Sequence, residues 1–285
     1  MTELTISTHV VGEGQDAITY DVQGDLSTGV PLFLFGAPMD ASGFRQLAEQ
    51  FPDRAVVTYD PRGTGRNATG VADITTAEHA EDVHRVIEAL GVGPVDAFGS
   101  SGGAVNLLTL AARHPADVRT VVAHEPPSAP LLPDADEVRA VISDLKRTYA
   151  EEGNGPAMAK FIGFVMYDGV VPAGYLEQPA PDPAMFGMSA EDDRDRTNPL
   201  FRNMPSIIVD PVDVDALRGL GDRLVLAYGV ESGQTMAARG ARAIAAAVGI
   251  EPTEFPGSHG SFHDEPMYPG IPVEFGVRLR EVLDR

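Results

Sequence analysis

The stretch VDAFGSSGGAVNLLTLAARH, residues 95–114, decides the fold. Its start, Val95–Phe98, has the character of a short buried strand. The small residues of Gly99–Gly103 allow a sharp turn, and Ala104–Arg113 has the composition of a helix. A strand, a tight turn and a helix in this order would present the central side chain of the turn, that of Ser101, at one end of a sheet.

Short apolar runs alternate with helical segments on both sides of this turn, and most of the runs are apolar on both faces. That pattern is typical of a parallel sheet covered by helices on both sides. The sequence therefore predicts an α/β fold with a mostly parallel, twisted sheet. The expected strands are Leu4–Val11, Ala17–Val22, Leu32–Phe35, Ala55–Tyr59, Val95–Phe98, Val118–Ala123, Arg223–Tyr228 and Glu251–Phe255. The expected helices of this core are Ser42–Gln50, Thr76–Leu90, Ala104–Arg113, Gln234–Val248 and Val273–Leu283.

The alternation stops over residues 128–220, which hold helical segments at Glu137–Glu151 and Ala157–Val165 and connectors rich in proline and aspartate. A structureless loop of that length is rare inside a compact domain. We therefore expect a core made of residues 1–127 and 221–285, with residues 128–220 inserted as a helical cap.

The composition excludes several classes of function. The formal net charge of −21 and the pI near 4.5 argue against nucleic acids and anionic membranes as partners, because both bind to basic surfaces. The chain has no cysteine, which rules out disulfides and thiolate chemistry. No signal peptide and no membrane-length apolar run are visible, so a cytoplasmic location is expected.

Ser101 is the candidate nucleophile, because the pattern Gly99-x-Ser101-x-Gly103 falls between the expected strand and helix. The helix start behind it would direct backbone N–H groups toward a developing oxyanion. Ser100 lies outside the glycine frame. For the same oxyanion, we expect the N–H groups of Ala37 and Gly102 to act as donors.

A serine nucleophile needs a base, and His259 follows the last expected strand in a glycine-flanked loop that can reach back to Ser101. Two carboxylates could orient its ring. Glu125 follows one strand and is fixed by two prolines, and Glu231 follows the next strand. Of the other histidines, His124 ends a strand and could be structural. His263 lies further from its strand end, and His9, His79, His84 and His114 are expected on early strands or exposed helix positions.

Three other sequence patterns give less information about function. Gly63–Ala68 nearly matches a dinucleotide fingerprint, but no helix start follows it, so no cofactor is expected. No cluster has the sequence spacing of metal ligands, so no metal is expected. Met158, Met166 and Met188 of the expected cap could fill gaps in its core or form an adaptable wall against a bulky apolar substrate.

At four motifs the chain resembles the α/β-hydrolase superfamily. Phe35–Pro38 resembles its His-Gly-x-Pro oxyanion turn, with phenylalanine in place of histidine. Asp60–Gly65 resembles its Asp-x-Arg-Gly-x-Gly turn. Gly99–Gly103 resembles its nucleophile elbow, and Gly257–Gly260 resembles its histidine loop. The resemblance implies an α/β-hydrolase fold with a serine nucleophile, whereas the related haloalkane dehalogenases and epoxide hydrolases use an aspartate.

A narrower resemblance is to the zearalenone lactone hydrolases. They have a Ser-Ser-Gly elbow and a His-Glu pair followed by proline, with the glutamate as triad acid. Gly99–Gly103 and His124–Pro127 are similar to that arrangement, which favours Glu125 over Glu231.

The sequence thus predicts a hydrolase of carboxylic esters, a lactonase or an esterase, acting on a bulky apolar substrate through Ser101, His259 and Glu125. Two alternatives stay open. The same three residues could perform C–C bond hydrolysis or cofactor-free perhydrolysis, or the fold could bind a small molecule without catalysis. A homodimer is compatible with the sequence.

Overall fold

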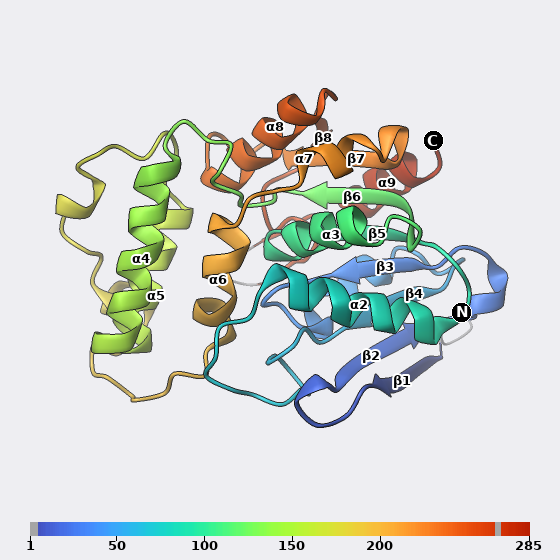
Figure 1. Ribbon diagram of the computed structural model, residues 1–285, viewed down its shortest axis with the longest axis horizontal. Helices are drawn as coiled ribbons and strands as arrows, with labels where there is room; N and C mark the ends of the chain where they lie inside the picture. Colours follow the sequence, from blue (N-terminus) through green and yellow to red (C-terminus); the bar gives the residue numbers. More distant parts are fainter. Residues whose placement is uncertain (1–4, 266–268) are drawn as a thin grey trace.

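The computed structural model describes residues 5–265 and 269–285, and it confirms the α/β fold. Its sheet has eight strands in the order β1-β2-β4-β3-β5-β6-β7-β8 (Figure 1). The strands are β1 Ile6–Val11, β2 Ile18–Gln23, β3 Leu32–Phe35, β4 Val56–Tyr59, β5 Val95–Ser100, β6 Val118–His124, β7 Leu224–Gly229 and β8 Thr253–Phe255. Leu4, expected at the start of the first strand, lies outside the described residues.

The sheet is antiparallel only between β1 and β2 and between β2 and β4. From β4 to β8 all neighbouring strands are parallel, so their carboxyl ends meet at one edge of the sheet. Ser101, Glu125 and the loop that carries His259 follow β5, β6 and β8, and all three therefore belong to that edge.

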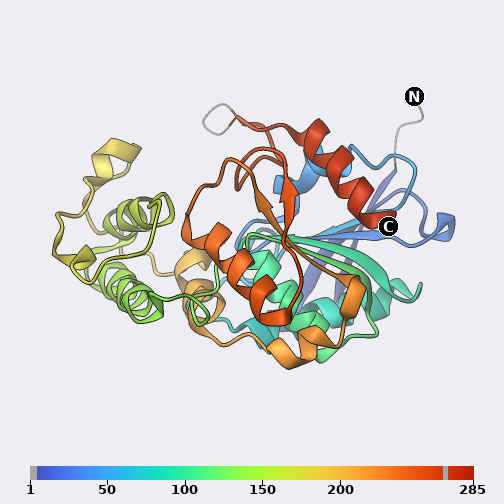
Figure 2. The ribbon, with the colours of Figure 1, turned by 90° about the horizontal axis from the view of Figure 1, so that it is seen from above.

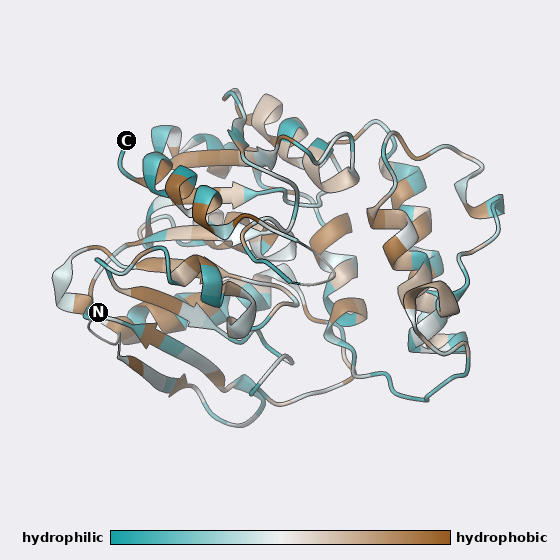
Figure 3. Ribbon diagram, turned by 180° about the vertical axis from the view of Figure 1, so that it is seen from behind, coloured by the Kyte–Doolittle hydropathy of each residue, from teal (hydrophilic) through white to brown (hydrophobic). Residues whose placement is uncertain are grey.

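Helices cover both faces of the sheet because its strands are apolar on both sides (Figure 3). One apolar core joins α2, α3, α7 and α8 to one face, and a second joins α1 and α9 to the other. Alternate residues of β3 divide between them, with Phe33 and Phe35 in the first core and Leu32 and Leu34 in the second. The helices are α1 Arg45–Ala48, α2 Thr76–Leu90, α3 Gly102–Arg113, α7 Val214–Arg218, α8 Met236–Val248 and α9 Pro272–Leu283.

Local capping explains where two of these helices begin. α2 starts and ends as predicted, because Thr75 and Glu78 form a reciprocal capping box and Gly91 ends the helix in the left-handed conformation, with φ 66°. The helix predicted over Ser42–Gln50 is shorter. Asp40 caps a 3₁₀ turn over Ala41–Phe44 first, and α1 begins only at Arg45.

Between β6 and β7 the chain forms three longer helices, α4 Ala135–Glu152, α5 Asn154–Val165 and α6 Pro199–Val209. α4 and α5 lie side by side, away from the sheet, and α6 lies between them and the carboxyl edge of the strands (Figures 1 and 2). Among the described residues, no helix is both long enough and apolar enough to cross a membrane.

Polar contacts fix α6 to the start of α2. The Thr76 N–H donates to Ser206 Oγ at 3.0 Å, and Arg202 Nε donates to the Ala72 carbonyl at 2.8 Å. The His79 ring bonds Asn203. The expectation that His79 is exposed was wrong: its side chain is fully buried, because α6 covers it. α6 is therefore held by the core as well as by α4.

A buried ion pair supports the amino end of β5. Asp96 is 0% exposed, and its carboxylate binds Arg54 Nη2 and Arg119 Nε, both at 2.7 Å. Asp53 offers a contrast, because its pair with Arg280 lies at the surface.

We predict that Asp96→Ala lowers the free energy of unfolding by about 2–3 kcal/mol, because it leaves the sheltered guanidinium of Arg54 without its buried partner, whereas the more exposed Arg119 can turn to water. Asp53→Ala should cost at most about 1 kcal/mol. Denaturant titration of both variants measures the difference, and equal losses would contradict this account of β5.

Candidate active site

Ser101 occupies the turn between β5 and α3 in a conformation that non-glycine residues rarely adopt, with φ 56° and ψ −129°. The turn is tight because backbone surrounds its glycines. A Cβ at Gly99 would lie 2.7 Å from the Gly103 carbonyl oxygen, and one at Gly103 would overlap the Phe35 carbonyl. Only glycine fits there, and the strain is concentrated at Ser101.

Ser101 is fixed through its backbone, while its hydroxyl is available to a bound molecule. The Ser101 N–H donates to the His124 carbonyl at 3.0 Å, which connects the turn to the end of β6. Its Oγ forms no hydrogen bond with any of the residues that the structure describes. The side chain is partly exposed, so a bound molecule can reach it.

Glu125 and His259 form a close pair at the same edge. His259 Nδ1 lies 2.6 Å from Glu125 Oε2, and the other carboxylate oxygen accepts the Gly229 N–H at 2.8 Å. Glu125 is fully buried and has a φ of 50°, while 45% of the His259 side chain is exposed. The carboxylate is thus held on both oxygens and leaves the far nitrogen of the imidazole facing outward.

Charge explains why this buried carboxylate is stable as an anion. Burial alone raises the pKa of Glu125, but the hydrogen bond from His259 and the nearby His124 lower it more, to about 2. Glu125 is therefore ionised throughout the physiological pH range.

Glu231, the other candidate acid, lies elsewhere. Its side chain is exposed, and among the described residues its carboxylate accepts no hydrogen bond. Its backbone N–H donates to the Gly257 carbonyl at 2.9 Å. Of the two glutamates, only Glu125 is in contact with His259.

His124 is buried beneath the candidate site and has a structural role, which the sequence analysis had left open. Its ring is fully buried, and burial lowers its pKa to about 4, so it is neutral at pH 7. Nδ1 lies 3.2 Å from Ser100 Oγ, and the ring centroid lies 6.4 Å from that of His259. Because the His124 ring is neutral, it does not compete with His259 for the negative charge of Glu125.

Ala37 and Gly102, the residues expected to supply the oxyanion donors, are in close backbone contact. A Cβ on Gly102 would overlap the Ala37 carbonyl oxygen and would lie 2.8 Å from Ile207 Cδ1 on α6. Neither the Ala37 nor the Gly102 N–H donates a hydrogen bond to a described residue. Ile207 was missed at the sequence level because nothing in the pattern of α6 indicates which strand end the helix covers.

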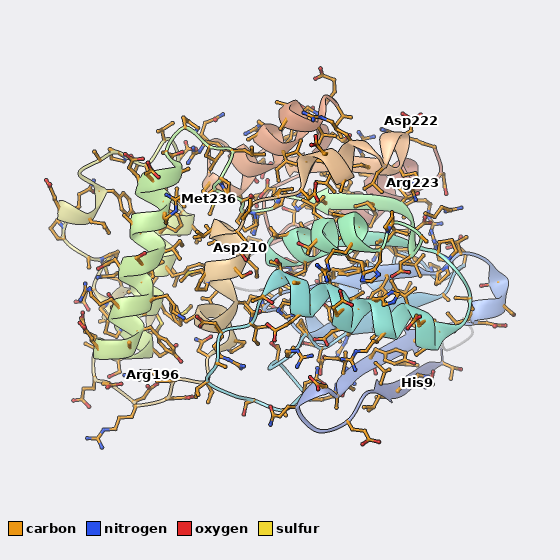
Figure 4. The ribbon with its side chains drawn as sticks, in the orientation of Figure 1. His9, Arg196, Asp210, Asp222, Arg223 and Met236 are labelled. Carbon is orange, nitrogen blue, oxygen red and sulfur yellow. The ribbon has the colours of Figure 1, made fainter. Side chains whose placement is uncertain are left out.

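An apolar cluster surrounds this region. It includes Ala37 and Ile207, and also Met236 at the start of α8, which is labelled in Figure 4. Of the three methionines singled out from the sequence, Met158 packs against the same cluster, Met188 lies beside Gly155, and Met166 is 67% exposed.

Comparison with known proteins identifies the family. A family model described as "alpha/beta hydrolase fold" matches residues 32–202, more than half of the chain. The protein belongs to the α/β-hydrolase family. The segment thus matched includes β3, the Ser101 turn, Glu125 and the first turn of α6.

Curated relatives match over shorter stretches. The chain is 34% identical over 140 residues to the uncharacterized hydrolase YraK of Bacillus subtilis, which covers 47% of this chain and 51% of YraK. It is 32% identical over 107 residues to the putative carbamate hydrolase RutD of Caulobacter vibrioides, which covers 35% of this chain and 39% of RutD. The match therefore spans about half or less of these relatives.

Solved structures share the fold over nearly the whole chain. The enol-lactonase of Burkholderia xenovorans has a TM-score of 0.65 at 18% identity and covers 94% of this chain and 97% of its own. MGS-M2, a hydrolase from a deep-sea metagenome, has a TM-score of 0.70 at 16% identity, with 97% and 98% covered. At these identities the likeness shows the fold alone.

The Glu125–His259 pair predicts a pH dependence of stability. The pKa of Glu125 falls from 4.5 to about 2 on folding, so the pair stabilises the fold above pH 4.5 and loses this effect as the pH falls toward 2. We predict that Glu125→Gln lowers the free energy of unfolding at pH 7 by at most about 3 kcal/mol and flattens its decline between these pH values.

Glu231→Gln is the matched control, because its carboxylate is exposed. It should change stability by no more than about 0.5 kcal/mol at any pH. Denaturant titrations from pH 2 to 7 measure both variants. Parallel curves for wild type and Glu125→Gln would contradict the role given to the pair.

Proposed function

We propose that the protein is a serine hydrolase of carboxylic esters, with Ser101 as nucleophile, His259 as proton carrier and Glu125 as the acid that orients His259. The 2.6 Å contact between Glu125 and His259, at the sheet edge where the strained turn presents Ser101, carries the proposal. A nucleophile, a base and a buried orienting carboxylate on neighbouring strand ends are what acyl transfer requires.

In the first half-reaction Ser101 Oγ attacks the ester carbonyl carbon while its proton passes to His259 Nε2. The carbonyl oxygen becomes an oxyanion, which the N–H groups of Ala37 and Gly102 stabilise. As the oxyanion collapses, the C–O bond to the alcohol breaks and His259 returns its proton to the leaving oxygen. Glu125 stays ionised and stabilises the imidazolium that exists between these two proton transfers.

In the second half-reaction water replaces the alcohol. His259 takes a proton from the water, whose oxygen attacks the acyl-enzyme carbonyl. The C–O bond to Ser101 then breaks, His259 returns the proton to Ser101 Oγ, and the acid leaves. With a lactone, the acid and the alcohol are parts of one molecule, so the ring opens and a single product leaves.

Ser101 and His259 are not hydrogen-bonded in the structure, and this agrees with the mechanism. Catalytic hydrogen bonds are often long without substrate and tighten when it binds. Because the His259 side chain is 45% exposed, its ring has room to turn toward Ser101 while Glu125 keeps hold of Nδ1.

The surroundings favour an apolar acyl or alcohol group. We infer that residues 128–220 act as a cap over the carboxyl edge, with Ile207 of α6 forming the wall beside the oxyanion donors. Met236 and the methionines Met158, Met166 and Met188 would extend that wall. The similarity of His124–Pro127 to the zearalenone lactone hydrolases makes macrocyclic lactones the first substrates to test.

The experiment compares hydrolysis of zearalenone and of a short-chain aryl ester by wild type and by Ser101→Ala. We expect turnover by the wild type and a loss of about 10⁴-fold or more in the variant, because the nucleophile is removed. The faster substrate would distinguish a lactonase from a simple esterase.

Ser100→Ala is the control, since Ser100 is a neighbouring hydroxyl outside the proposed chemistry. It should retain most of the activity. Unchanged turnover in Ser101→Ala would contradict the proposal, and so would an equal loss in both variants.

A further inference from the structure

A second cluster of ligating side chains lies at the opposite end of the sheet. His84 of α2 and His114, at the end of α3, come together with Asp117 just before β6. One ligating atom from each of the three lies within 4.8 Å of the others. The sequence indicated no metal site because helix packing, rather than sequence spacing, assembles this set.

The three side chains are already in contact with one another. His84 Nδ1 lies 2.6 Å from Asp117 Oδ2, and the two imidazole rings are stacked with centroids 3.9 Å apart and an interplanar angle of 10°. The side chains of His84, His114 and Asp117 are 25%, 23% and 14% exposed, so the cluster is sheltered but open to ions from solvent.

We propose that His84, His114 and Asp117 form a binding site for a divalent transition-metal ion such as Zn²⁺. Two imidazole nitrogens and one carboxylate oxygen suit Zn²⁺, Ni²⁺ or Co²⁺, whereas Mg²⁺ and Ca²⁺ prefer oxygen ligands alone. The metal takes the place of the hydrogen bond between His84 Nδ1 and Asp117. Both imidazoles bind the ion in their neutral form, and in His84 the ring proton is then carried by Nε2.

Bond lengths of about 2.0–2.2 Å place the ligating atoms of a tetrahedral zinc site about 3.3–3.5 Å apart. His84 Nδ1 and Asp117 Oδ2 therefore separate by about 1 Å to admit the ion, and the His114 ring turns out of its stack so that its nitrogen also points at the ion. Partly exposed side chains accomplish these changes by rotation about their χ angles. Water completes the coordination.

The charges around the cluster favour a cation. Glu81 lies 3.2 Å from His114 Nε2, and Glu88 lies 3.7 Å from His84 Nε2. With Asp117 these are three carboxylates. Arg113 binds Glu81, and Arg223 donates to the carbonyls of Pro115 and Val118. The carboxylates outnumber these guanidinium groups, which favours binding of a cation.

The role of this site is structural. His114 and Asp117 precede β6, while Glu125 follows its far end, and a strand of seven residues is about 20 Å long. The metal would therefore not reach Ser101. It would instead join α2 to the turn between α3 and β6.

Isothermal titration of the full-length protein with ZnCl₂ tests the proposal, with MgCl₂ as the control ion. We expect one zinc per chain and a rise in Tm of roughly 5 °C at saturating zinc. His84→Gln should weaken zinc binding by at least about tenfold and remove the rise in Tm. Asp117→Asn keeps the shape of its side chain and should do the same.

Two other variants separate this site from the other histidines. His9 is an exposed histidine on β1 (Figure 4), and His9→Gln should bind zinc as the wild type does. His259→Gln tests the catalytic pair as the source of binding. Full zinc binding by His84→Gln and Asp117→Asn, or its loss only in His259→Gln, would overturn the proposal.

Discussion

The turn between β5 and α3 has no room for a side chain at Gly99, Gly102 or Gly103, and the rest of the site depends on that constraint. Because α3 and the end of β3 approach the turn so closely, the chain can reverse only by forcing Ser101 to a φ of 56°. The same approach brings Gly102 against the Ala37 carbonyl. A single packing constraint therefore determines the position of the Ser101 hydroxyl and brings the end of β3 close to it.

The parallel sheet supplies the partners of Ser101. The Ser101 N–H bonds the His124 carbonyl, and the next residue along β6 is Glu125, which binds His259. Glu125 has a φ of 50°, so two consecutive strands end in residues of positive φ. Strained backbone of this kind persists where the surrounding structure fixes it, and here it occurs at the candidate nucleophile and at the carboxylate that binds His259.

Local signals in the sequence were enough for much of the fold. The capping box at Thr75 and the glycine at 91 predict both ends of α2, and the alternation of apolar runs with helices predicts the parallel sheet. Local signals were not enough for Ser42–Gln50, where the aspartate cap at Asp40 favours a 3₁₀ turn first.

Contacts between distant segments could not be predicted in the same way. Glu125 and Glu231 both follow strand ends, and only the three-dimensional path of the β8 loop decides which of them meets His259. His79 was expected at the surface because the sequence pattern of α2 does not indicate that α6 covers this residue. The cluster of His84, His114 and Asp117 likewise exists only through the packing of α2 against α3.

Covalent trapping tests the central claim, that Ser101 is an activated nucleophile, most directly. The protein is treated with a fluorophosphonate, digested and analysed by mass spectrometry, beside a His259→Ala variant. The account predicts one adduct per chain, on Ser101, and little or none without the His259 imidazole. An adduct on another residue, or no adduct on the wild-type protein, would contradict it.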